Sequence, residues 1–175
     1  MEIILILHNI RSILNVGSIF RSADGFGIKK IYLSGCTPSP NSGLPHVRDK
    51  LAKQLHKTAL GAEQYVDFES VVVNKPFFEK LRSDGYEIIG LEQDKRATLL
   101  SDFSVSKHNK IALILGAEVH GIPIEIRELC DSFIEIPMYG HKESFNVAVA
   151  AGIALYGLTT ISPPRSPSHK YHRAL

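Results

Sequence analysis

Five uninterrupted runs of apolar residues, separated by segments with helical spacing, constrain the fold of this chain more than any other feature. A strand with one face in water alternates apolar and polar residues, whereas these runs do not alternate, so each predicts a strand buried on both faces. Buried strands joined by helices form a mostly parallel sheet, and we predict an α/β fold with helices on both faces. The predicted strands span residues 2–7, 29–35, 86–92, 110–116 and 132–137.

Helical spacing is clearest after the first strand, where apolar residues recur from Val16 to Ala23 at intervals of three and four residues. Asn15 stands just before this pattern and is predicted as the helix N-cap. A basic, partly helical segment covers residues 47–63, and further helices are predicted over residues 70–83, 123–130 and 144–160. The last helix is apolar on almost every side, so it must be covered all round.

The length of 175 residues predicts a single domain, which we place at residues 1–161, followed by a Pro-rich basic tail at 162–175. With 44% hydrophobic and 22% charged residues, the composition is that of a folded protein. The formal net charge of +2 is too small to identify a polyanionic partner by itself.

The sequence also predicts where the protein works. No apolar run is long enough to span a membrane, and the first ten residues lack the basic region and cleavage site of a signal peptide. Cys36 and Cys130 are far apart and form no CxxC pair, which is typical of reduced thiols. We therefore expect a soluble cytoplasmic protein that does not bind membranes.

Several common catalytic motifs are missing. The chain has no Walker-type phosphate loop, no G-x-G-x-x-G after the first strand and no G-x-S-x-G nucleophile elbow. Its eight histidines are scattered, and none forms H-x-x-x-H with a nearby acid, so we expect no metal site. A P-loop NTPase, a Rossmann dehydrogenase and an α/β-hydrolase are all disfavoured.

Glycines and polar residues follow two predicted strands directly, at residues 116–121 and 137–146. Ligands of parallel sheets bind at the carboxyl ends of the strands, and glycine lets backbone groups approach a ligand closely. We expect a cofactor held mostly by backbone atoms, with an apolar slot near Ile136 and Met138 for a flat ring. The alternative is ordinary turn chemistry, with Ser144 acting only as a helix N-cap.

Three stretches together resemble the SpoU (TrmH-like) branch of the SPOUT RNA methyltransferases. They are "NVGSIFRSA" (15–23), "LILGAEVHGIP" (113–123) and "IEIPMYGHKESFNVAVAAGIALYGL" (134–158), in the order and spacing of the family. The resemblance implies transfer of a methyl group from S-adenosylmethionine to a ribose 2′-hydroxyl of tRNA or rRNA. It also implies a homodimer and a SPOUT fold whose C-terminal part forms a deep trefoil knot.

The resemblance also assigns residues. Its catalytic set is Arg21, Asn15, Glu118, Ser144 and Asn146, and its cofactor-binding set is Leu115, Gly116, Glu118, Ile136, Met138, Ser144 and Asn146. Arg21 has been proposed in the family as a base. A guanidinium stays protonated far above neutral pH, so we favour a clamp on an RNA phosphate that also stabilises the developing alkoxide. Asn15 either orients the substrate or Arg21, or caps its helix, and Gly17 permits a close approach.

RNA binding is predicted for Arg21 and for a basic strip, whose alternative is a solvated helix face. The strip comprises Arg48, Lys50, Lys53, His56 and Lys57. In a family dimer, Asn15 and Arg21 could serve a cofactor bound by the partner. The final helix, which is rich in small residues, then lies at the interface or is buried within its own chain.

Several functions remain open. The chain resembles the minimal tRNA-modifying members of the family, which favours tRNA over rRNA as the substrate. A non-catalytic RNA-binding or cofactor-binding module has the same fold, but retention of Asn15, Arg21, Glu118 and Asn146 argues against it. A base-nitrogen methyltransferase needs a general base near the ring, and none is evident. A plain nucleotide-binding protein is the third alternative.

Overall fold

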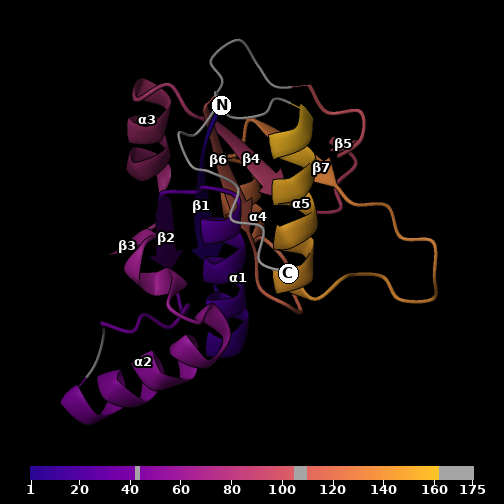
Figure 1. Ribbon diagram of the computed structural model, residues 1–175. Coiled ribbons are helices and arrows are strands. Elements are labelled where there is room, and N and C mark those ends of the chain that lie inside the picture. Colours follow the sequence, from indigo (N-terminus) through magenta and orange to yellow (C-terminus); the bar gives the residue numbers. More distant parts are fainter. Residues whose placement is uncertain (42–43, 105–109, 162–175) are drawn as a thin grey trace.

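The computed structural model describes residues 1–41, 44–104 and 110–161 (Figure 1). The strands are β1 (Glu2–His8), β2 (Lys30–Ser34), β3 (Asp67–Val71), β4 (Glu87–Leu91), β5 (Ala97–Leu99), β6 (Lys110–Leu115) and β7 (Ser132–Glu135). The helices are α1 (Ile13–Gly25), α2 (Pro45–Ala59), the short 3₁₀ helix η1 (Ala62–Gln64), α3 (Lys75–Ser83), α4 (Ile124–Arg127) and α5 (Val147–Ile161). The predicted tail lies outside the described residues.

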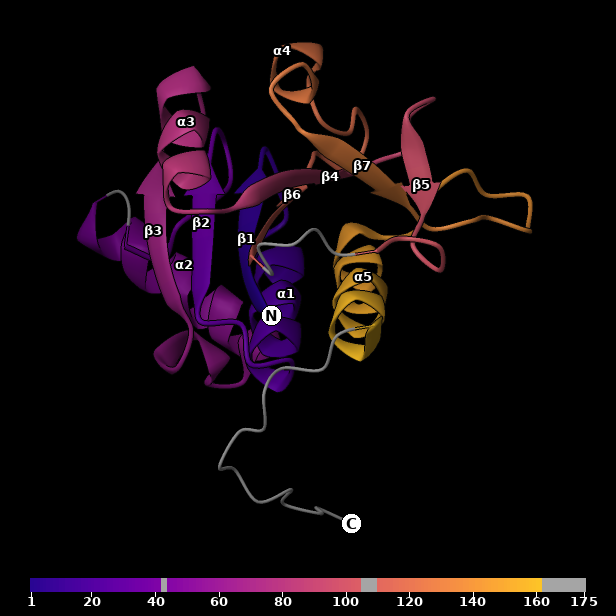
Figure 2. The same ribbon diagram turned by 90° about the horizontal axis from the view of Figure 1, so that it is seen from above.

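The seven strands form one parallel sheet in the order β3-β2-β1-β6-β4-β7-β5. Helices α1 and α5 cover one face and α3 and α4 cover the other (Figure 2), which confirms the predicted α/β architecture. Helix α2 packs on the outer side of α1. Alternate residues of β1 illustrate the division, because Leu5 and Leu7 join the core under α1 and α5 while Ile4 and Ile6 join the core under α3 and α4.

Two strands were not predicted, and both lie at the edges of the sheet. Strand β3 is mostly exposed or half-buried and carries acidic residues, so its sequence lacks a continuous apolar run. Strand β5 is only three residues long. The helix predicted over 70–83 is wrong at its start: β3 extends to Val71, and α3 begins only after Asn74, whose side chain accepts a hydrogen bond from the Phe77 N–H at 3.0 Å.

The predicted helix caps also need correction. Ser12, not Asn15, is the N-cap of α1, because its hydroxyl accepts the backbone N–H of Asn15 at 3.3 Å. The helix expected over 123–130 is shortened to the four residues of α4. At the last helix Asn146, not Ser144, accepts the N–H groups of Ala148 and Val149 at 2.9 and 3.4 Å. Asn15 therefore lies inside the first turn of α1 and is not its cap, whereas Asn146 caps α5 and does not lie within it.

The apolar sequence of α5 predicted a helix covered on every side, but within the chain α5 is covered on only part of its surface. Ala151, Ala154, Leu155 and Leu158 are buried, and they form the face that packs on the core. On the other side, the exposed fractions of Val149 and Tyr156 are 49% and 63%, so one face of α5 remains open. A helix wholly buried within its own chain is thereby excluded. No helix in the described part of the chain has the length and apolar character needed to cross a membrane.

Gly17 is where α1 and α2 come together, as the prediction of a close approach required. A Cβ atom at this position would lie 2.2 Å from Thr58 Oγ1 and 2.5 Å from the carbonyl oxygen of Leu55. The Thr58 hydroxyl also donates to the carbonyl of Leu14 at 2.9 Å. The motif glycine thus admits a neighbouring helix and has a packing role.

Candidate active site

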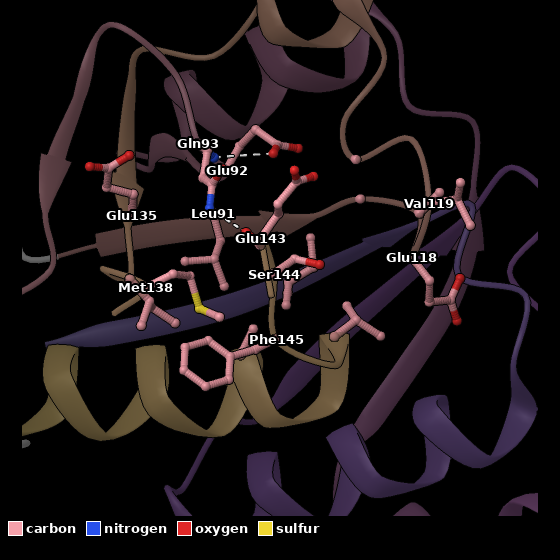
Figure 3. A pocket seen from close by; sticks show the side chains of 17 residues that line it. Leu91, Glu92, Gln93, Glu118, Val119, Glu135, Met138, Glu143, Ser144 and Phe145 are labelled. Carbon is pink, nitrogen blue, oxygen red and sulfur yellow. Dashed lines mark hydrogen bonds between the residues drawn. The ribbon is translucent and has the colours of Figure 1, made fainter. Parts of the chain in front are cut away.

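A pocket of about 280 Å³ opens at the carboxyl ends of β4, β6 and β7 (Figure 3). Its walls come from the three segments that leave those strands and from the start of α5. Six of the seven residues predicted to bind a cofactor line it, namely Leu115, Gly116, Glu118, Ile136, Met138 and Ser144. The seventh, Asn146, lies beside the pocket and is not part of its lining. The pocket therefore lies at the edge of the sheet where ligands of parallel sheets bind, and whether its lining residues bind a cofactor stays a prediction.

The segment after β6 is a tight turn that only glycine permits at both ends. Ala117 and Gly121 exchange backbone hydrogen bonds of 3.0 and 2.9 Å, which brings the two ends of the turn together. A Cβ atom on Gly116 would lie 2.2 Å from the backbone of Gly121, and Gly121 itself has a φ of +63°. The turn holds Glu118 at its tip.

Glu118, Asn15 and Asn146 form one hydrogen-bonded network that joins the three sequence motifs. The amide of Asn15 donates to the Glu118 carboxylate at 3.0 Å, and the amide of Asn146 donates to Asn15 Oδ1 at 3.2 Å. The Glu118 carboxylate also accepts the backbone N–H groups of Arg11 and Ser12, at 3.3 and 3.4 Å. The free N–H groups at the start of α1 are thus partly satisfied by a carboxylate from another segment.

This environment keeps Glu118 ionised. Partial burial raises the pKa of Glu118, but hydrogen bonds from its own backbone, from Asn15 and from the backbone of Arg11 and Ser12 outweigh burial and lower it below the ordinary value. A carboxylate with a lowered pKa and several donors is a weak proton acceptor. Its geometry suits it to fix the position of Asn15 instead.

Arg21 is exposed on α1 and does not line the pocket. It lies six residues after Asn15, which corresponds to about 9 Å along a helix. Among the described residues it makes no hydrogen bond or ion pair, so its guanidinium is available to an external anion. A single chain therefore brings together Asn15, Glu118, Ser144 and Asn146, and does not bring Arg21 to them.

The predicted basic strip falls on α2 and is only partly continuous. Lys50, Lys53 and Lys57 recur at intervals of three and four residues, so they share one exposed stripe of the helix. Arg48 lies on a different side, and its guanidinium is 4.0 Å from the carboxylate of Asp49. His56 lies at the edge of the stripe, three residues after Lys53, but its ring bonds to Glu63, with 2.7 Å between Nδ1 and Oε1. We expect the three lysines to form the basic surface.

A second polar cluster occupies the carboxyl ends of β1 and β2. His8 Nδ1 lies 2.6 Å from the hydroxyl of Ser34, and the Asn9 amide donates to His8 Nε2 at 3.0 Å. Burial lowers the pKa of His8 below 6.5, and the charge of Glu125 opposes this only partly. His8 is thus held neutral and stabilises the loops beside the site.

The residues after β4 also line the pocket, and sequence reasoning missed them. Leu91, Glu92 and Gln93 contribute one wall. Leu91 is the last residue of β4, and Glu92 and Gln93 come directly after it at the end of the strand predicted over 86–92, so the rule applied to β6 and β7 would have found them. They were overlooked because they contain no glycine. In the described part of the chain, no three histidine, cysteine, aspartate or glutamate side chains gather in a way that could hold a metal ion.

Comparison with known proteins places this chain in a family. Residues 2–156 match the sequence profile of the SpoU rRNA Methylase family. The 23S rRNA (guanosine-2'-O-)-methyltransferase RlmB of Nitrosomonas europaea is 32% identical over 157 residues, which cover 88% of this chain and 54% of that protein. The tRNA (guanosine(18)-2'-O)-methyltransferase of Borreliella burgdorferi is 31% identical over 99 residues, which cover 57% of this chain and 44% of that protein. The chain thus spans about half the length of the curated relatives it matches.

Solved structures show the same fold. The TrmH/SpoU tRNA modifying enzyme of A. aeolicus matches with a TM-score of 0.75 at 24% identity, over 91% of this chain and 75% of that one. The AdoMet-bound rRNA methyltransferase of Sinorhizobium meliloti matches with a TM-score of 0.76 at 22% identity, over 91% of this chain and 56% of that one. The profile match and the similarity to RlmB over most of the chain show that this protein belongs to the SpoU rRNA methylase family.

Proposed function

We propose that the chain is an S-adenosylmethionine-dependent methyltransferase that acts on a ribose 2′-hydroxyl of RNA, with tRNA as the preferred substrate. The observation that carries the proposal is the network Glu118–Asn15–Asn146, which joins three motifs distant in sequence at the edge of one pocket. Membership of the SpoU family supports the reaction type. Curated relatives include proteins named for tRNA and for 23S rRNA, so rRNA is the alternative substrate.

The pocket fits S-adenosylmethionine in the character of its walls. Leu91, Leu115, Ile136 and Met138 offer apolar surface for a flat ring, and the turn at Gly116 leaves backbone groups at the rim. When bound, the cofactor supplies a methyl group on a positively charged sulfur, which is a strong electrophile. In this proposal, these backbone groups and side chains would hold the cofactor.

The chain's remaining task is to place a ribose oxygen in line with that methyl group. Asn15 is fixed by Glu118 and Asn146, so its amide is positioned before substrate arrives. Arg21 carries a permanent charge and makes no bond within the described chain, which suits a clamp on the RNA phosphate. The same charge stabilises the alkoxide that develops as the hydroxyl passes its proton to an oxygen of that phosphate.

A homodimer completes this arrangement. Arg21 lies outside the pocket of its own chain, while Leu14, Val149 and Tyr156 leave apolar surface exposed on α1 and α5. Their exposed fractions are 46%, 49% and 63%, and because α1 packs against α5 we infer that they form one apolar surface for a partner to cover. In the proposed dimer, these faces meet and Arg21 of one protomer serves the pocket of the other. We place this dimer in the cytoplasm.

The C-terminal part forms a deep trefoil knot in this proposal. Strand β6 lies between β1 and β4, and β7 lies between β4 and β5, so each later strand is inserted between two earlier ones. This strand order is compatible with a threaded chain, and the knot itself is taken from the resemblance to the SPOUT methyltransferases, because general connection rules disfavour knots.

Methyl transfer from labelled S-adenosylmethionine tests the function. Unmodified transcripts of tRNA and of 23S rRNA fragments are incubated with the purified protein, and the modified nucleosides are identified by mass spectrometry. We expect a 2′-O-methylated nucleoside from tRNA, and loss of the product with Arg21→Ala while cofactor affinity changes less than about tenfold. A methylated base nitrogen, or full activity of the variant, contradicts the proposal. Product from rRNA fragments alone selects the alternative substrate.

A further inference from the structure

Three consecutive residues after β4 each bind a different segment around the pocket. Glu92 bonds to the turn after β6, Gln93 to the loop after β7, and Asp94 to helix α4. The segment Glu92–Asp94 therefore joins the turn after β6 to the loop after β7, and is itself anchored on α4. It lies outside the three family motifs quoted above.

Glu92 fixes the turn that carries Glu118. Its carboxylate accepts the N–H of Ile122 at 2.9 Å and that of Gln93 at 3.1 Å. A Cβ atom on Gly121 would lie 2.0 Å from Glu92 Oε2, so the turn is packed directly on this carboxylate. Glu92 thereby sets the distance between the segment after β4 and the turn after β6.

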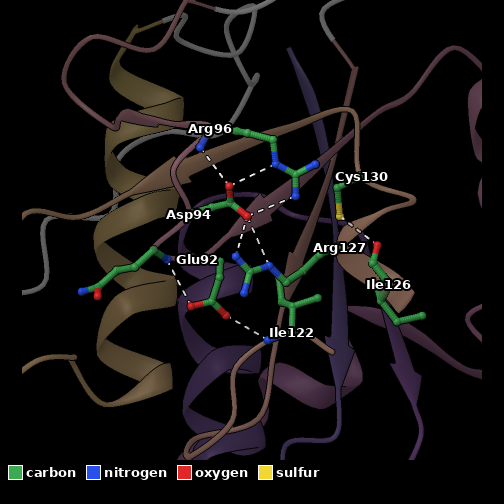
Figure 4. A network of polar contacts seen from close by, with 8 residues as sticks. Glu92, Asp94, Arg96, Ile122, Ile126, Arg127 and Cys130 are labelled. Carbon is green, nitrogen blue, oxygen red and sulfur yellow. Dashed lines mark hydrogen bonds and ion pairs between the residues drawn. The ribbon is translucent and has the colours of Figure 1, made fainter. Parts of the chain in front are cut away.

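Asp94 anchors the other end of the segment (Figure 4). Its side chain is only 6% exposed and accepts hydrogen bonds from Arg96 Nε at 3.0 Å and from Arg127 Nη2 at 2.5 Å. The bonds from Arg96 and Arg127 lower the pKa of Asp94 far below its ordinary value. Both guanidinium groups also lie over the ring of Phe133, 4.6 and 6.0 Å from its centre. The segment is held rigidly on both sides of Gln93.

Gln93 is the exposed member of the segment and reaches across the pocket. Its amide Nε2 donates to the carbonyl oxygen of Glu143 at 2.7 Å (Figure 3). Glu143 precedes Ser144, and both line the pocket. Gln93 is held by its neighbours and residues 139–146 of the loop are exposed, so this hydrogen bond ties the exposed loop to an anchored segment, in addition to the bond from Asn146 to Asn15 at the end of the loop.

We propose that Gln93 is a positioning residue that fastens the loop of residues 136–146 in the closed position over the cofactor. The proposal rests on the proposed function, because it names S-adenosylmethionine as the ligand that the closed loop retains. Gln93 acts here through its amide donor and the loop, and its own carbonyl is not required. Release of the bond opens the loop and lets the cofactor enter or leave.

Two substitutions separate this role from direct contact with the cofactor. Gln93→Glu keeps the size of the side chain and removes the donor, while Gln93→Lys removes the carbonyl and keeps a donor. We expect Gln93→Glu to weaken S-adenosylmethionine binding by about two- to tenfold, the range for one neutral hydrogen bond, and Gln93→Lys to bind within about twofold of the native protein. The reverse ranking would show that Gln93 accepts a bond from the cofactor, and would overturn the proposal.

Hydrogen exchange of the full chain without added cofactor provides the second readout. Backbone amides of residues 138–145 should exchange about two- to tenfold faster in Gln93→Glu than in the native protein, with Gln93→Lys unchanged. Gln64→Glu is the control, because it makes the same change at an exposed glutamine of η1 away from the pocket. Equal exchange rates in Gln93→Glu and the native protein would refute the proposal that Gln93 fastens the loop. If the native chain fails to bind the cofactor, the proposed function fails, and exchange alone still decides whether the bond fastens the loop.

Discussion

Substitution of Gly17 by alanine tests whether the motif glycine packs helices or serves the ligand. The new Cβ would lie 2.5 Å from the carbonyl oxygen of Leu55, and ordinary contact begins near 3.4 Å. Helices α1 and α2 must therefore separate by about 1 Å, unless other atoms move. The hydroxyl of Thr58 must also leave its place 2.2 Å from the Cβ, which endangers its hydrogen bond to Leu14.

The magnitude follows from three contributions. Overpacking of this kind costs about 1–3 kcal/mol, and loss of the threonine hydrogen bond adds about 1 kcal/mol. Alanine is favoured over glycine inside a helix by about 1 kcal/mol, which opposes both. We expect Gly17→Ala to lower the free energy of unfolding by about 1–3 kcal/mol.

Urea unfolding followed by circular dichroism measures this change. For a slope of about 2 kcal/mol per molar urea, the midpoint should fall by about 0.5–1.5 M. Gly25→Ala in the same helix is the matched control, since its Cβ would have no neighbour within 4 Å, and it should be neutral or slightly stabilising. Cofactor affinity should stay within about twofold in both variants. A Gly17→Ala protein that is as stable as the native chain but fails to bind the cofactor would refute the packing role.

Three further predictions concern the basic surface, the cluster at β1 and the network. The double variant Lys50→Ala, Lys53→Ala should weaken RNA binding and reduce the slope of log affinity against log salt concentration by about 1–2. Lys29→Ala is the control and should not change this slope measurably. An unaltered slope in the double variant would show that these lysines do not bind RNA phosphates. Because burial lowers the pKa of His8 below 6.5, its contribution to stability is present above that pH and is lost as the pH falls below it. The drop in urea midpoint between about pH 7.5 and about pH 5.5 should therefore be smaller in His8→Gln, and an equal drop contradicts this assignment. Asn15→Asp places a second carboxylate in the network and should slow methyl transfer by at least about tenfold at neutral pH, with the urea midpoint as a check on folding.

The sequence was most informative where one physical requirement dominates. Strands buried on both faces, such as β1 and β6, must be continuously apolar, so they were predicted to within about two residues. The residues of edge strands β3 and β5 are half-buried or exposed, so these strands need no continuous apolar run, and their composition did not reveal them.

The site was predicted as a set of residues, but its connections were not. Asn15 and Asn146 were recognised in their motifs, while their hydrogen bond depends on how α1 and α5 approach each other. The N-cap of α1 was assigned to Asn15 because asparagine is a good cap, yet Ser12 is equally suited and stands where the helix begins. The role proposed for Gln93 depends on a contact with Glu143, fifty residues away, which no local pattern encodes.

The position of the transferred methyl group tests the central claim most directly. A methyl group on a ribose 2′-oxygen blocks alkaline cleavage of the adjacent phosphodiester, because cleavage needs the free hydroxyl as a nucleophile. RNA treated with the protein and methyl-labelled S-adenosylmethionine should therefore release its label in alkali-resistant dinucleotides, and RNA treated with Arg21→Ala should carry no such label. Label found only in alkali-released mononucleotides, or no transfer by the native protein to any unmodified RNA, would contradict the account.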